Sequence, residues 1–517
     1  MLMRSKALES LQGEFDVLII GGGATGLGIA VDAATRGYRI ALVEAGDFAQ
    51  ATSSRATKLV HGGVRYLASG QIHLVYEALH ERAVMLRNAP HLVQSLAFVL
   101  PAYKWIDLPF YGIGLKIYDL LSGKSSMGPT HILGRKQTQQ RLPNINGANL
   151  SGSILYHDGQ FDDARLALAL ARTAEDHGAV VLNYVRSKSF LKEAGRIVGA
   201  VVEDIETGAE TTVRAKVVIN ATGIFVDDLR KEDNPSIPKL LSVSRGTHIV
   251  VAASVLAGET AIMVPKTEDG RVIFAIPWSG RVVIGTTDIA ATDVEMEPGH
   301  QESEIEYLMQ HINPYLASPI QRSDILSIFS GLRPLVTGKS ATTSKLSREH
   351  HIDVSPTGLI TIAGGKWTTY RRMAEDALNF AISHQMLPKQ PCRTREIRIH
   401  GAPIPGAPAA GPLSRYGSDA EEISLLMAAD PALTATVDTE LPFRIAEVVY
   451  AVRHEMARTV EDVLSRRMRA LLIDAKAAWR AAPVVASVMA KELGRSPEWE
   501  QQQIAAFQKL ATEFYLP

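Results

Sequence analysis

The sequence predicts an α/β fold: a Rossmann-like domain, a mainly antiparallel β domain interleaved with it, and a C-terminal α-helical domain. Three observations predict this architecture. Residues 15–44 have the pattern of a strand, a tight turn, a helix and a second strand. Alternating strand patterns dominate residues 242–288. A stretch rich in Pro, Gly and Ala at residues 400–417 marks a linker, and residues 419–517 are largely helical in pattern.

The N-terminal unit is recognised by the glycines that separate its predicted strands and helix. Residues 15–20 form a compact apolar run, which indicates a buried strand. Residues 21–23 are all glycine and turn the chain, after which residues 24–36 have helical composition and end at Gly37, a natural helix C-cap. Residues 38–44 form a second buried strand. About 30 residues is the size of one βαβ unit.

Further along the chain, the same patterns predict additional elements. Helices are expected at residues 70–86, 162–177 and 368–384. Residues 180–213 resemble a β-meander, and residues 217–220 and 359–363 are buried strands. Residues 95–121 mix six aromatic side chains with Lys104 and Lys116, so they form either an aromatic-rich core loop or an interfacial segment.

Composition and charge exclude several classes of protein. The chain has 517 residues, of which 46% are hydrophobic and 21% charged, with a net charge of −1. It therefore has no global basic field to attract nucleic acid. The single cysteine, Cys392, excludes an internal disulfide and a multi-cysteine metal site, and no metal site is predicted. Neither a signal peptide nor a run of roughly 18 apolar residues is present, so we expect no membrane-spanning helix.

The turn after the first strand carries a dinucleotide-binding motif. Gly21-Gly22-Gly23-Ala24-Thr25-Gly26 fits G-x-G-x-x-G between a strand and a helix, and Glu44 ends the next strand. The glycines allow a tight turn, close approach of a pyrophosphate and close helix–strand packing. Glu44 would accept hydrogen bonds from ribose hydroxyls and repel a 2′-phosphate, which disfavours NADP. Much later in the chain, one strand ends at Ala221-Thr222-Gly223 and another at Gly364-Gly365-Lys366. This distribution suits an extended cofactor and favours FAD over NAD.

A set of motifs together resembles a known family. They are Thr52-Ser53-Ser54, Lys58-Leu59-Val60-His61-Gly62-Gly63-Val64-Arg65-Tyr66-Leu67, Ile284-Gly285-Thr286-Thr287-Asp288, Ser330-Gly331-Leu332-Arg333-Pro334-Leu335, Gly364-Gly365-Lys366-Trp367-Thr368-Thr369-Tyr370-Arg371 and, near the C-terminus, Val452-Arg453-His454-Glu455 and Asp462-Val463-Leu464-Ser465-Arg466-Arg467. Their joint occurrence is similar to the FAD-dependent glycerol-3-phosphate dehydrogenases from about residue 15 to the end of the chain. Arg55-Ala56-Thr57, Val64 and Trp367 depart from the usual family pattern.

The resemblance implies a cofactor site and a domain division. Residues 1–395 form the FAD-dependent oxidoreductase region, with FAD-binding segments at about 15–90, 150–235 and 345–390 and substrate segments at about 91–149 and 236–344. Residues 396–416 form the linker and residues 417–517 the C-terminal helical domain. The predicted FAD contacts are Gly21, Gly22, Gly23, Thr25, Gly26, Glu44, Thr52, Ser53, Ser54, Lys58, Leu59, His61, Gly62, Gly63, Val185, Ala221, Thr222, Gly223, Gly331, Arg333, Gly365, Lys366, Trp367 and Thr368.

The resemblance also implies a substrate, sn-glycerol 3-phosphate, and the residues that act on it. Guanidinium groups pair well with phosphate oxygens, and the implied substrate-binding residues are Arg65, Tyr66, His248, Arg333 and Arg348. His248, Arg333 and Lys366 are the implied catalytic residues. His248 is the favoured base because an imidazole suits proton abstraction near neutrality, and His61 is the alternative. Lys366 would hold substrate or stabilise charge on the reduced flavin.

The electron acceptor implied by the respiratory relatives is a membrane quinone. That reading places the protein in the cytoplasm, peripherally attached to the cytoplasmic face of the inner membrane, and leaves a homodimer open. Three alternatives remain: an oxidase that passes electrons to O2, an amine- or amino-acid-oxidising flavoenzyme, and a non-catalytic flavoprotein. No EF-hand pattern occurs in the C-terminal region, so calcium regulation is not expected.

Overall fold

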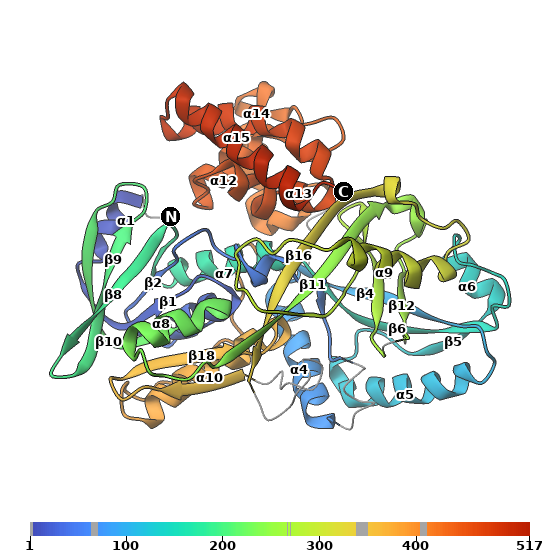
Figure 1. The fold of residues 1–517 in the computed structure, drawn as a ribbon, viewed down its shortest axis with the longest axis horizontal. Helices are drawn as coiled ribbons and strands as arrows, with labels where there is room; N and C mark the ends of the chain where they lie inside the picture. Colours follow the sequence, from blue (N-terminus) through green and yellow to red (C-terminus); the bar gives the residue numbers. More distant parts are fainter. Residues whose placement is uncertain (1–3, 64–70, 266, 269, 338–349, 404–410) are drawn as a thin grey trace.

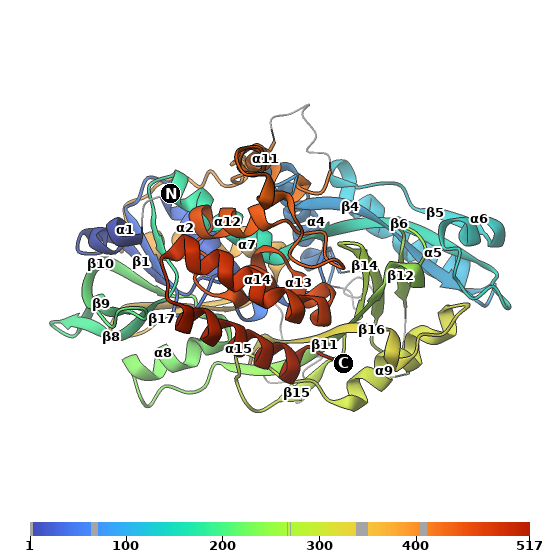
Figure 2. The same ribbon diagram turned by 90° about the horizontal axis from the view of Figure 1, so that it is seen from above.

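Two β-sheets lie side by side, and a helical domain covers the region where they meet (Figure 1). The computed structural model describes residues 4–63, 71–265, 267, 268, 270–337, 350–403 and 411–517. Seen from above, the C-terminal helices lie across the middle of the molecule (Figure 2). The predicted α/β class with a helical C-terminal region is therefore confirmed.

The first sheet, sheet A, has a mainly parallel centre. Its path is β17 (His350–Val354), β18 (Leu359–Gly364), β10 (Glu210–Asn220), β1 (Glu14–Ile20), β2 (Ile40–Val43) and β7 (Val180–Leu182). β18, β10, β1, β2 and β7 are parallel neighbours, and β17 pairs with β18 antiparallel. A hairpin of β8 (Val185–Glu193) and β9 (Arg196–Asp204) extends β10. The predicted meander is thus β8–β9–β10, and residues 217–220 continue β10.

Helices pack on sheet A because their apolar residues face it. The helix after β1, α2 (Ala24–Thr35), is buried along almost its whole length between α7 (Asp163–Asp176) and α10 (Tyr370–Ser383). The shared core consists of the alanine-rich faces of these helices and the branched side chains of the central strands. Two short helices complete this half, α1 (Arg4–Ser10) and α8 (Val226–Asp233). This packing fixes the N-terminus of α2 above the carboxyl ends of the parallel strands.

The second sheet, sheet B, is antiparallel except where β12 pairs with β4. Its path is β15 (Ile289–Ala291), β11 (Leu241–Ala252), β14 (Arg281–Gly285), β13 (Ile273–Trp278), β12 (Ala261–Val264), β4 (Val93–Ala102), β6 (Gly152–Phe161) and β3 (Leu59–Val60). β16 (Ile325–Val336) pairs with β11, and β5 (His131–Gly134) pairs with β6. Its helices are α4 (Ile72–Asn88), α5 (Asp107–Ser122), α6 (Arg135–Arg141) and α9 (Glu302–Ile312).

Two strands differ from the segment boundaries expected from sequence. β3 and β6 fall in segments assigned to the FAD-binding part, yet both belong to sheet B, where β3 pairs with β6 and β6 with β4. These strands belong to sheet B because of long-range strand pairing. β6 forms a ten-residue antiparallel ladder with β4, and a local sequence pattern does not reveal this partner. The chain crosses from sheet B back to sheet A where β6 leads into α7.

The C-terminal domain is built from α11 (Ala420–Ala429), α12 (Ile445–His454), α13 (Ala470–Ile473), α14 (Ala475–Leu493) and α15 (Pro497–Phe514). A π-helical segment, Asp462–Arg467, precedes α13. The core of this domain also contains Val250, Trp278, Val283 and Phe329 from sheet B. The helical domain and sheet B therefore bury a continuous apolar interface.

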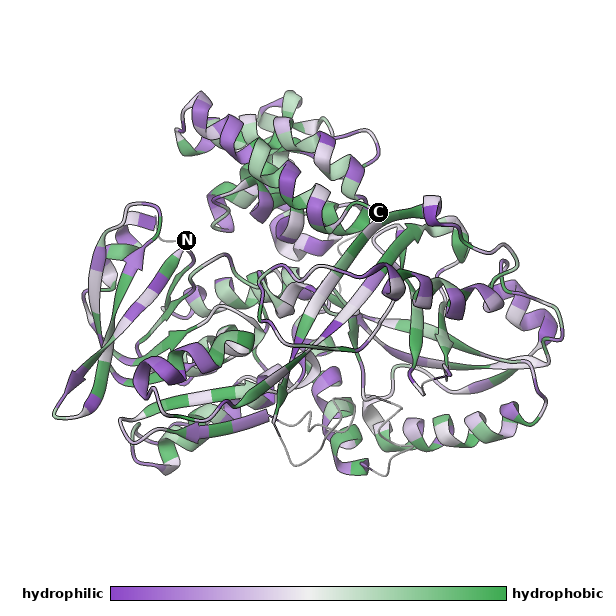
Figure 3. Ribbon diagram, in the orientation of Figure 1, coloured by the Kyte–Doolittle hydropathy of each residue, from purple (hydrophilic) through white to green (hydrophobic). Residues whose placement is uncertain are grey.

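Residues 95–121 are neither a loop nor uniformly exposed. β4 is buried where it crosses sheet B, and α5 follows it on the surface. The exposed large apolar residues of this region lie on or next to α5: Trp105, Ile106, Phe110, Ile113, Ile117 and Leu120. Green, hydrophobic segments recur along this helix in Figure 3. Within the described part of the chain, no helix is both long and apolar enough to cross a membrane.

Candidate functional site

The glycine-rich turn forms a cradle at the N-terminus of α2. Gly21 has a φ of +114°, and a Cβ there would lie 2.6 Å from the carbonyl oxygen of Ala221. A Cβ on Gly26 would lie 1.9 Å from the Gly21 carbonyl oxygen, so only glycine allows the helix to pack this close. The amide of Ala24, the first residue of α2, donates to Ser53 Oγ at 3.0 Å. The amide-lined end of α2 suits a diphosphate.

Glu44 lies at the end of β2, beside this turn. Its Oε2 accepts from the amide of Gly22 at 2.6 Å and its Oε1 from that of Gly46 at 2.8 Å. Burial raises the pKa of Glu44, and the backbone hydrogen bonds from Gly46 and Gly22 oppose that shift. A carboxylate held in this way keeps lone pairs for ribose hydroxyls and would repel a phosphate on the ribose. The cradle and this acceptor fit the adenosine diphosphate half of FAD.

A first pocket extends along this cradle. Many of the predicted cofactor contacts line it: Gly21, Gly23, Thr25, Glu44, Thr52, Ser53, Val185, Ala221, Thr222 and Gly223. Thr52 also lines a second pocket, which contains the predicted contacts Leu59, His61, Gly331, Arg333, Gly365, Lys366, Trp367 and Thr368. The two pockets therefore share a wall and offer an elongated site that an extended dinucleotide would span.

A third pocket adjoins the second on the sheet B side. Both are lined by Thr57, Leu59, His61 and Arg333. The third pocket also contains the predicted contact Gly63, together with polar groups from Asp158, Thr286, Thr287 and Asp288. Phe98, Tyr156, Met263 and Phe274 also line it and contribute aromatic and apolar surface. This pocket is a suitable place for a small polar substrate in front of a flavin ring.

Five predicted cofactor residues are not part of the pocket linings: Gly22, Gly26, Ser54, Lys58 and Gly62. Gly22 supports Glu44 through its amide, and Gly62 donates its amide to the Tyr118 hydroxyl at 2.8 Å. The carbonyl of Ser54 accepts from Lys58 Nζ at 2.9 Å. Lys58 is fully buried, its Nζ also donates to Asp163 at 2.7 Å, and burial lowers the pKa of Lys58 to about 7. The Lys58 ammonium therefore bonds to Asp163 and the Ser54 carbonyl, and Lys58 lines none of the three pockets.

His248 lies at the centre of the site on β11. Its Nε2 is 3.0 Å from the Thr57 hydroxyl, and its ring stacks on Phe329 at a centroid distance of 4.6 Å. Burial holds the pKa of His248 well below its usual range, and the positive charges of Arg333 and Lys58 lower it further. The neutral form of the ring is therefore favoured, with Nε2 next to the Thr57 hydroxyl and Nδ1 buried.

Arg333 comes from the adjacent strand, β16, and its guanidinium reaches the same pockets. Nη2 donates to Thr286 Oγ1 and to the Thr287 carbonyl, both at 3.0 Å. Asp288 lies 3.4 Å from Nη1. The side chain passes over Gly246, where a Cβ would lie 2.2 Å from Nη2. Gly285 makes the corresponding space for the His248 ring, because a Cβ there would lie 2.2 Å from His248 Cδ2.

The segment after β18 brings a remote part of the chain into the site. Lys366 precedes the short 3-10 helix Trp367–Thr369 and lines the second pocket. Trp367 donates its Nε1 to the Ser53 carbonyl at 2.8 Å, which ties this segment to the loop after β2. His61 faces both substrate-side pockets and makes an edge contact with Phe274.

Three of the predicted substrate ligands, Arg65, Tyr66 and Arg348, lie outside the described residues. Sequence reasoning did not select Thr57, Thr286, Thr287 or Asp288 as site residues, although all of them line the substrate-side pockets. Thr286, Thr287 and Asp288 belong to the Ile284–Asp288 family motif, and Thr57 is one of the positions that depart from the usual family pattern. Both features could have pointed to these residues. In the part of the chain that the structure covers, no group of three or more His, Cys, Asp or Glu side chains is arranged to hold a metal ion.

Comparisons with known proteins identify the family of the chain. A family model described as FAD dependent oxidoreductase matches residues 16–371, and one described as C-terminal domain of alpha-glycerophosphate oxidase matches residues 355–503. The mitochondrial glycerol-3-phosphate dehydrogenase of Homo sapiens is 40% identical over 543 residues, covering 98% of this chain and 74% of the relative. A probable glycerol-3-phosphate dehydrogenase of Encephalitozoon cuniculi is 38% identical, covering 95% of this chain and 84% of the relative.

Solved structures give the same result. The glycerol-3-phosphate dehydrogenase of Bacillus halodurans, complexed with FAD, superposes with a TM-score of 0.80 at 30% identity, covering 99% of this chain and 97% of that chain. The L-alpha-glycerophosphate oxidase of Mycoplasma pneumoniae shares the fold, with a TM-score of 0.57 at 17% identity over 74% of this chain and 97% of that chain. The cradle, the neutral histidine, the arginine beside it and these full-length matches lead to one conclusion: the chain belongs to the family of FAD-dependent glycerol-3-phosphate dehydrogenases.

Proposed function

We propose that this protein oxidises sn-glycerol 3-phosphate to dihydroxyacetone phosphate. The observation that carries the proposal is the juxtaposition of a neutral, buried His248 and the Arg333 guanidinium in pockets that continue into the dinucleotide cradle. His248 can remove a hydroxyl proton, and Arg333 can bind a phosphate. The full-length relatives carry the same activity in their names.

FAD, when bound, supplies the hydride acceptor for C2 of the substrate. The protein must then remove the proton of the C2 hydroxyl, and the neutral imidazole of His248 is the group we assign to this step. Thr57, hydrogen bonded to Nε2, and Phe329, stacked on the ring, fix the orientation of the imidazole. A ring held in one orientation needs little reorganisation before proton transfer.

Arg333 is the proposed phosphate ligand in the described part of the site. The Thr286 hydroxyl and the Thr287 carbonyl accept hydrogen bonds from Nη2, and Asp288 lies 3.4 Å from Nη1, so the planar guanidinium is held at the wall of the substrate-side pockets. Arg65, Tyr66 and Arg348 remain predicted ligands of the same phosphate. Lys366, on the pocket wall, adds positive charge, either beside the substrate or beside the flavin ring.

Addition of glycerol 3-phosphate to the purified holoenzyme without oxygen tests this function. The visible absorbance of oxidised flavin should bleach, whereas glycine or D-alanine should leave it unchanged. Bleaching by an amino acid instead would favour an amine-oxidising enzyme, and no bleaching by any of these compounds would favour a non-catalytic flavoprotein. Stoichiometric peroxide under air would identify an oxidase.

We further propose that a membrane quinone accepts the electrons and that the protein binds the membrane peripherally. The support is the apolar face around α5, where the exposed fractions are 75% for Trp105, 71% for Phe110 and 80% for Leu120. Isolated exposed apolar residues are ordinary, but a cluster on one helix is typical of an interaction surface. Lys104 and Lys116 flank this face and suit anionic headgroups. The relatives are named as mitochondrial proteins; for this chain we propose the cytoplasmic face of the inner membrane, and a homodimer stays a prediction.

A further inference from the structure

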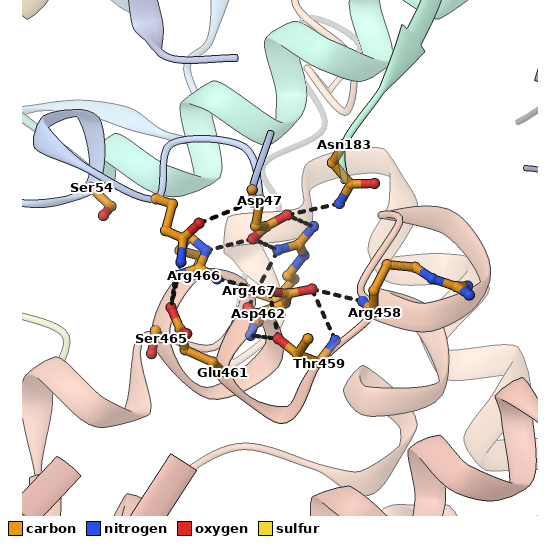
Figure 4. Close-up of polar contacts among 12 residues, drawn as sticks. Asp47, Ser54, Asn183, Arg458, Thr459, Glu461, Asp462, Ser465, Arg466 and Arg467 are labelled. Carbon is orange, nitrogen blue, oxygen red and sulfur yellow. Dashed lines mark hydrogen bonds and ion pairs between the residues drawn. The ribbon is translucent and has the colours of Figure 1, made fainter. Parts of the chain in front are cut away.

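Arginines of the C-terminal domain reach the loop that carries the FAD contacts. This loop, residues 44–58, runs from the end of β2 to β3 and includes Glu44 and the Thr52–Ser54 turn. The arginines belong to the π-helical segment Asp462–Arg467 and to Arg469, the residue before α13. Figure 4 shows the contacts around Asp47, which join two parts of the chain that are more than 400 positions apart.

Asp47 is the anchor at one end of the loop. Arg467 donates to both of its carboxylate oxygens, and Arg466 Nε donates to Oδ2. Asn183 Nδ2 completes the set with a hydrogen bond to Oδ1 at 3.0 Å. All three charged side chains are buried. Burial raises the pKa of Asp47, but the two guanidinium groups outweigh it and keep the pKa low, so the carboxyl is ionised.

From Asp47 the path to the cofactor site is short. The neighbouring amide, that of Gly46, donates to Glu44 Oε1, and the amide of Gly22 donates to Glu44 Oε2. The amide of Ala49 returns to the Gly22 carbonyl at 3.0 Å. Fixing Asp47 therefore fixes both the ribose-binding carboxylate and the glycine turn that receives the diphosphate.

Arg469 anchors the other end of the loop. Its Nη2 donates to the Ser54 carbonyl and to Asp163 Oδ1, both at 2.7 Å, while Lys58 bonds the same carbonyl and Asp163 Oδ2. The preceding residue, Ser53, accepts the first amide of α2 on its hydroxyl and the Trp367 indole on its carbonyl. The C-terminal domain is thus connected to the loop at both edges of the cradle.

Association of the two domains alone would not require the arginine contacts to Asp47 and to the Ser54 carbonyl. Buried ion pairs contribute little net stability, because removing the charges from water offsets most of their attraction. Other arginine pairs already join the C-terminal domain to α7 and to the turn between β9 and β10 without touching the loop, namely Arg172 with Asp419 and Arg458 with Glu206. The pairs at Asp47 and Ser54 instead act on backbone next to cofactor-binding groups, which indicates a role in geometry.

We infer that Arg466, Arg467 and Arg469 are positioning residues for FAD: the docked C-terminal domain sets the shape of residues 44–58 and so determines how tightly FAD is held. The coupling is reciprocal, because a ligand favoured by the docked domain must itself favour docking. This inference needs FAD binding alone and is independent of the substrate and of the electron acceptor.

The test measures release of FAD from the diluted holoenzyme by the fluorescence of the free cofactor. In R467K and R469K, the charge remains but the planar fork is lost. We expect the FAD dissociation constant to rise roughly tenfold or more in each variant, equivalent to about 1.4 kcal/mol. R172K, which alters an interdomain arginine away from the loop, should stay within about twofold of the wild type. At saturating FAD, both loop variants should keep the wild-type KM for glycerol 3-phosphate.

An unchanged dissociation constant in both loop variants, or an equal rise in R172K, would overturn the inference in favour of general adhesion. A second measurement uses the wild-type chain alone, so it does not depend on a variant folding. Backbone amides of residues 462–469 should exchange more slowly with deuterium in holoenzyme than in apoprotein. Equal protection in both states would contradict the coupling, even if glycerol 3-phosphate still bleaches the flavin.

Discussion

His248 stacks on Phe329, its directly opposite partner in the β11–β16 ladder, with ring planes inclined by only 11°. This pairing places the imidazole between an aromatic face and the Thr57 hydroxyl, away from bulk water. A histidine in that setting loses its charge readily and cannot rotate freely. Burial therefore favours the neutral imidazole at this position, whereas an exposed histidine on the same strand would be partly protonated near neutrality.

Replacing His248 by Asn should slow flavin reduction by about 10²–10⁴-fold, the usual contribution of a general base. Single-turnover absorbance after anaerobic mixing with substrate measures this rate. H61N serves as the comparison, because His61 lines the same pockets. If H61N lost the activity and H248N kept it, the assignment would pass to His61.

The pH dependence follows from the lowered pKa of His248. The folded-state pKa of His248 lies below the unfolded value of about 6.5. Titration of His248 should therefore cause no fall in kcat/KM near pH 6.5. The lowered pKa also affects stability. Between the folded-state pKa and pH 6.5, the unfolded chain binds more protons at His248 than the folded chain does, so His248 lowers the free energy of unfolding as pH falls. A pH profile of H248N that loses stability on acidification as steeply as wild type would remove His248 from this role.

Truncating Arg333 to Ala should raise the KM for glycerol 3-phosphate about 10- to 150-fold, since hydrogen bonds to charged groups contribute roughly 1.5–3 kcal/mol. The bound FAD should remain, and steady-state kinetics with a flavin content measurement would show both. R281A is a matched control on sheet B, because Arg281 contacts Asp474 and the Glu440 carbonyl instead of the pockets. An unchanged KM in R333A would exclude Arg333 from the phosphate site.

His400 ties α7 to the C-terminal domain and should make stability depend on pH. Its Nδ1 lies 2.6 Å from Asp176 and its Nε2 3.1 Å from Asp419. Burial lowers the pKa of His400, but the hydrogen bonds to Asp176 and Asp419 raise it more, to about 9. Since the folded pKa lies above the unfolded value, the stabilisation is complete below about 6.5 and is lost as pH rises through 9.

The check is the thermal midpoint of holoenzyme between pH 6 and 9.5, in wild type and in H400Q. The decline across this range should be smaller in H400Q, and H384Q, which alters an exposed histidine, should behave as wild type. The contribution of His400 to the free energy of unfolding is at most a few kcal/mol, because a shift of one pKa unit corresponds to about 1.4 kcal/mol. Identical slopes in wild type and H400Q would show that another group governs this window.

The apolar face of α5 predicts membrane binding that is separable from catalysis. Changing Phe110, Ile113 and Leu120 together to Ser should reduce cosedimentation with anionic vesicles, because each buried apolar side chain contributes about 1.5–3 kcal/mol. Reduction of a soluble dye by glycerol 3-phosphate should stay unchanged. L425S provides the control, since Leu425 is an exposed apolar residue on α11. Equal vesicle binding by the triple variant and the control would reject this surface.

Local patterns predicted the parts of the fold that depend on neighbouring residues. The β1–α2–β2 unit, its glycine turn and Glu44 occur where the sequence places them, because a tight turn and close helix–strand packing constrain adjacent positions. The C-terminal helices follow from their apolar spacing in the same way. The assignment of β3 and β6 to sheet B did not follow, because strand pairing depends on partners far along the chain.

The sequence by itself determined which chemical groups the protein has and which cofactor half the N-terminal turn accepts, since these depend on residue type and short spacing. Only the tertiary structure decided what those groups do. It buried His248 against Phe329, which favours the neutral imidazole, and it paired the Lys58 ammonium with Asp163. It also brought Arg467 and Arg469 to the FAD loop. Burial and long-range contact set pKa and orientation, and neither is encoded within a few residues.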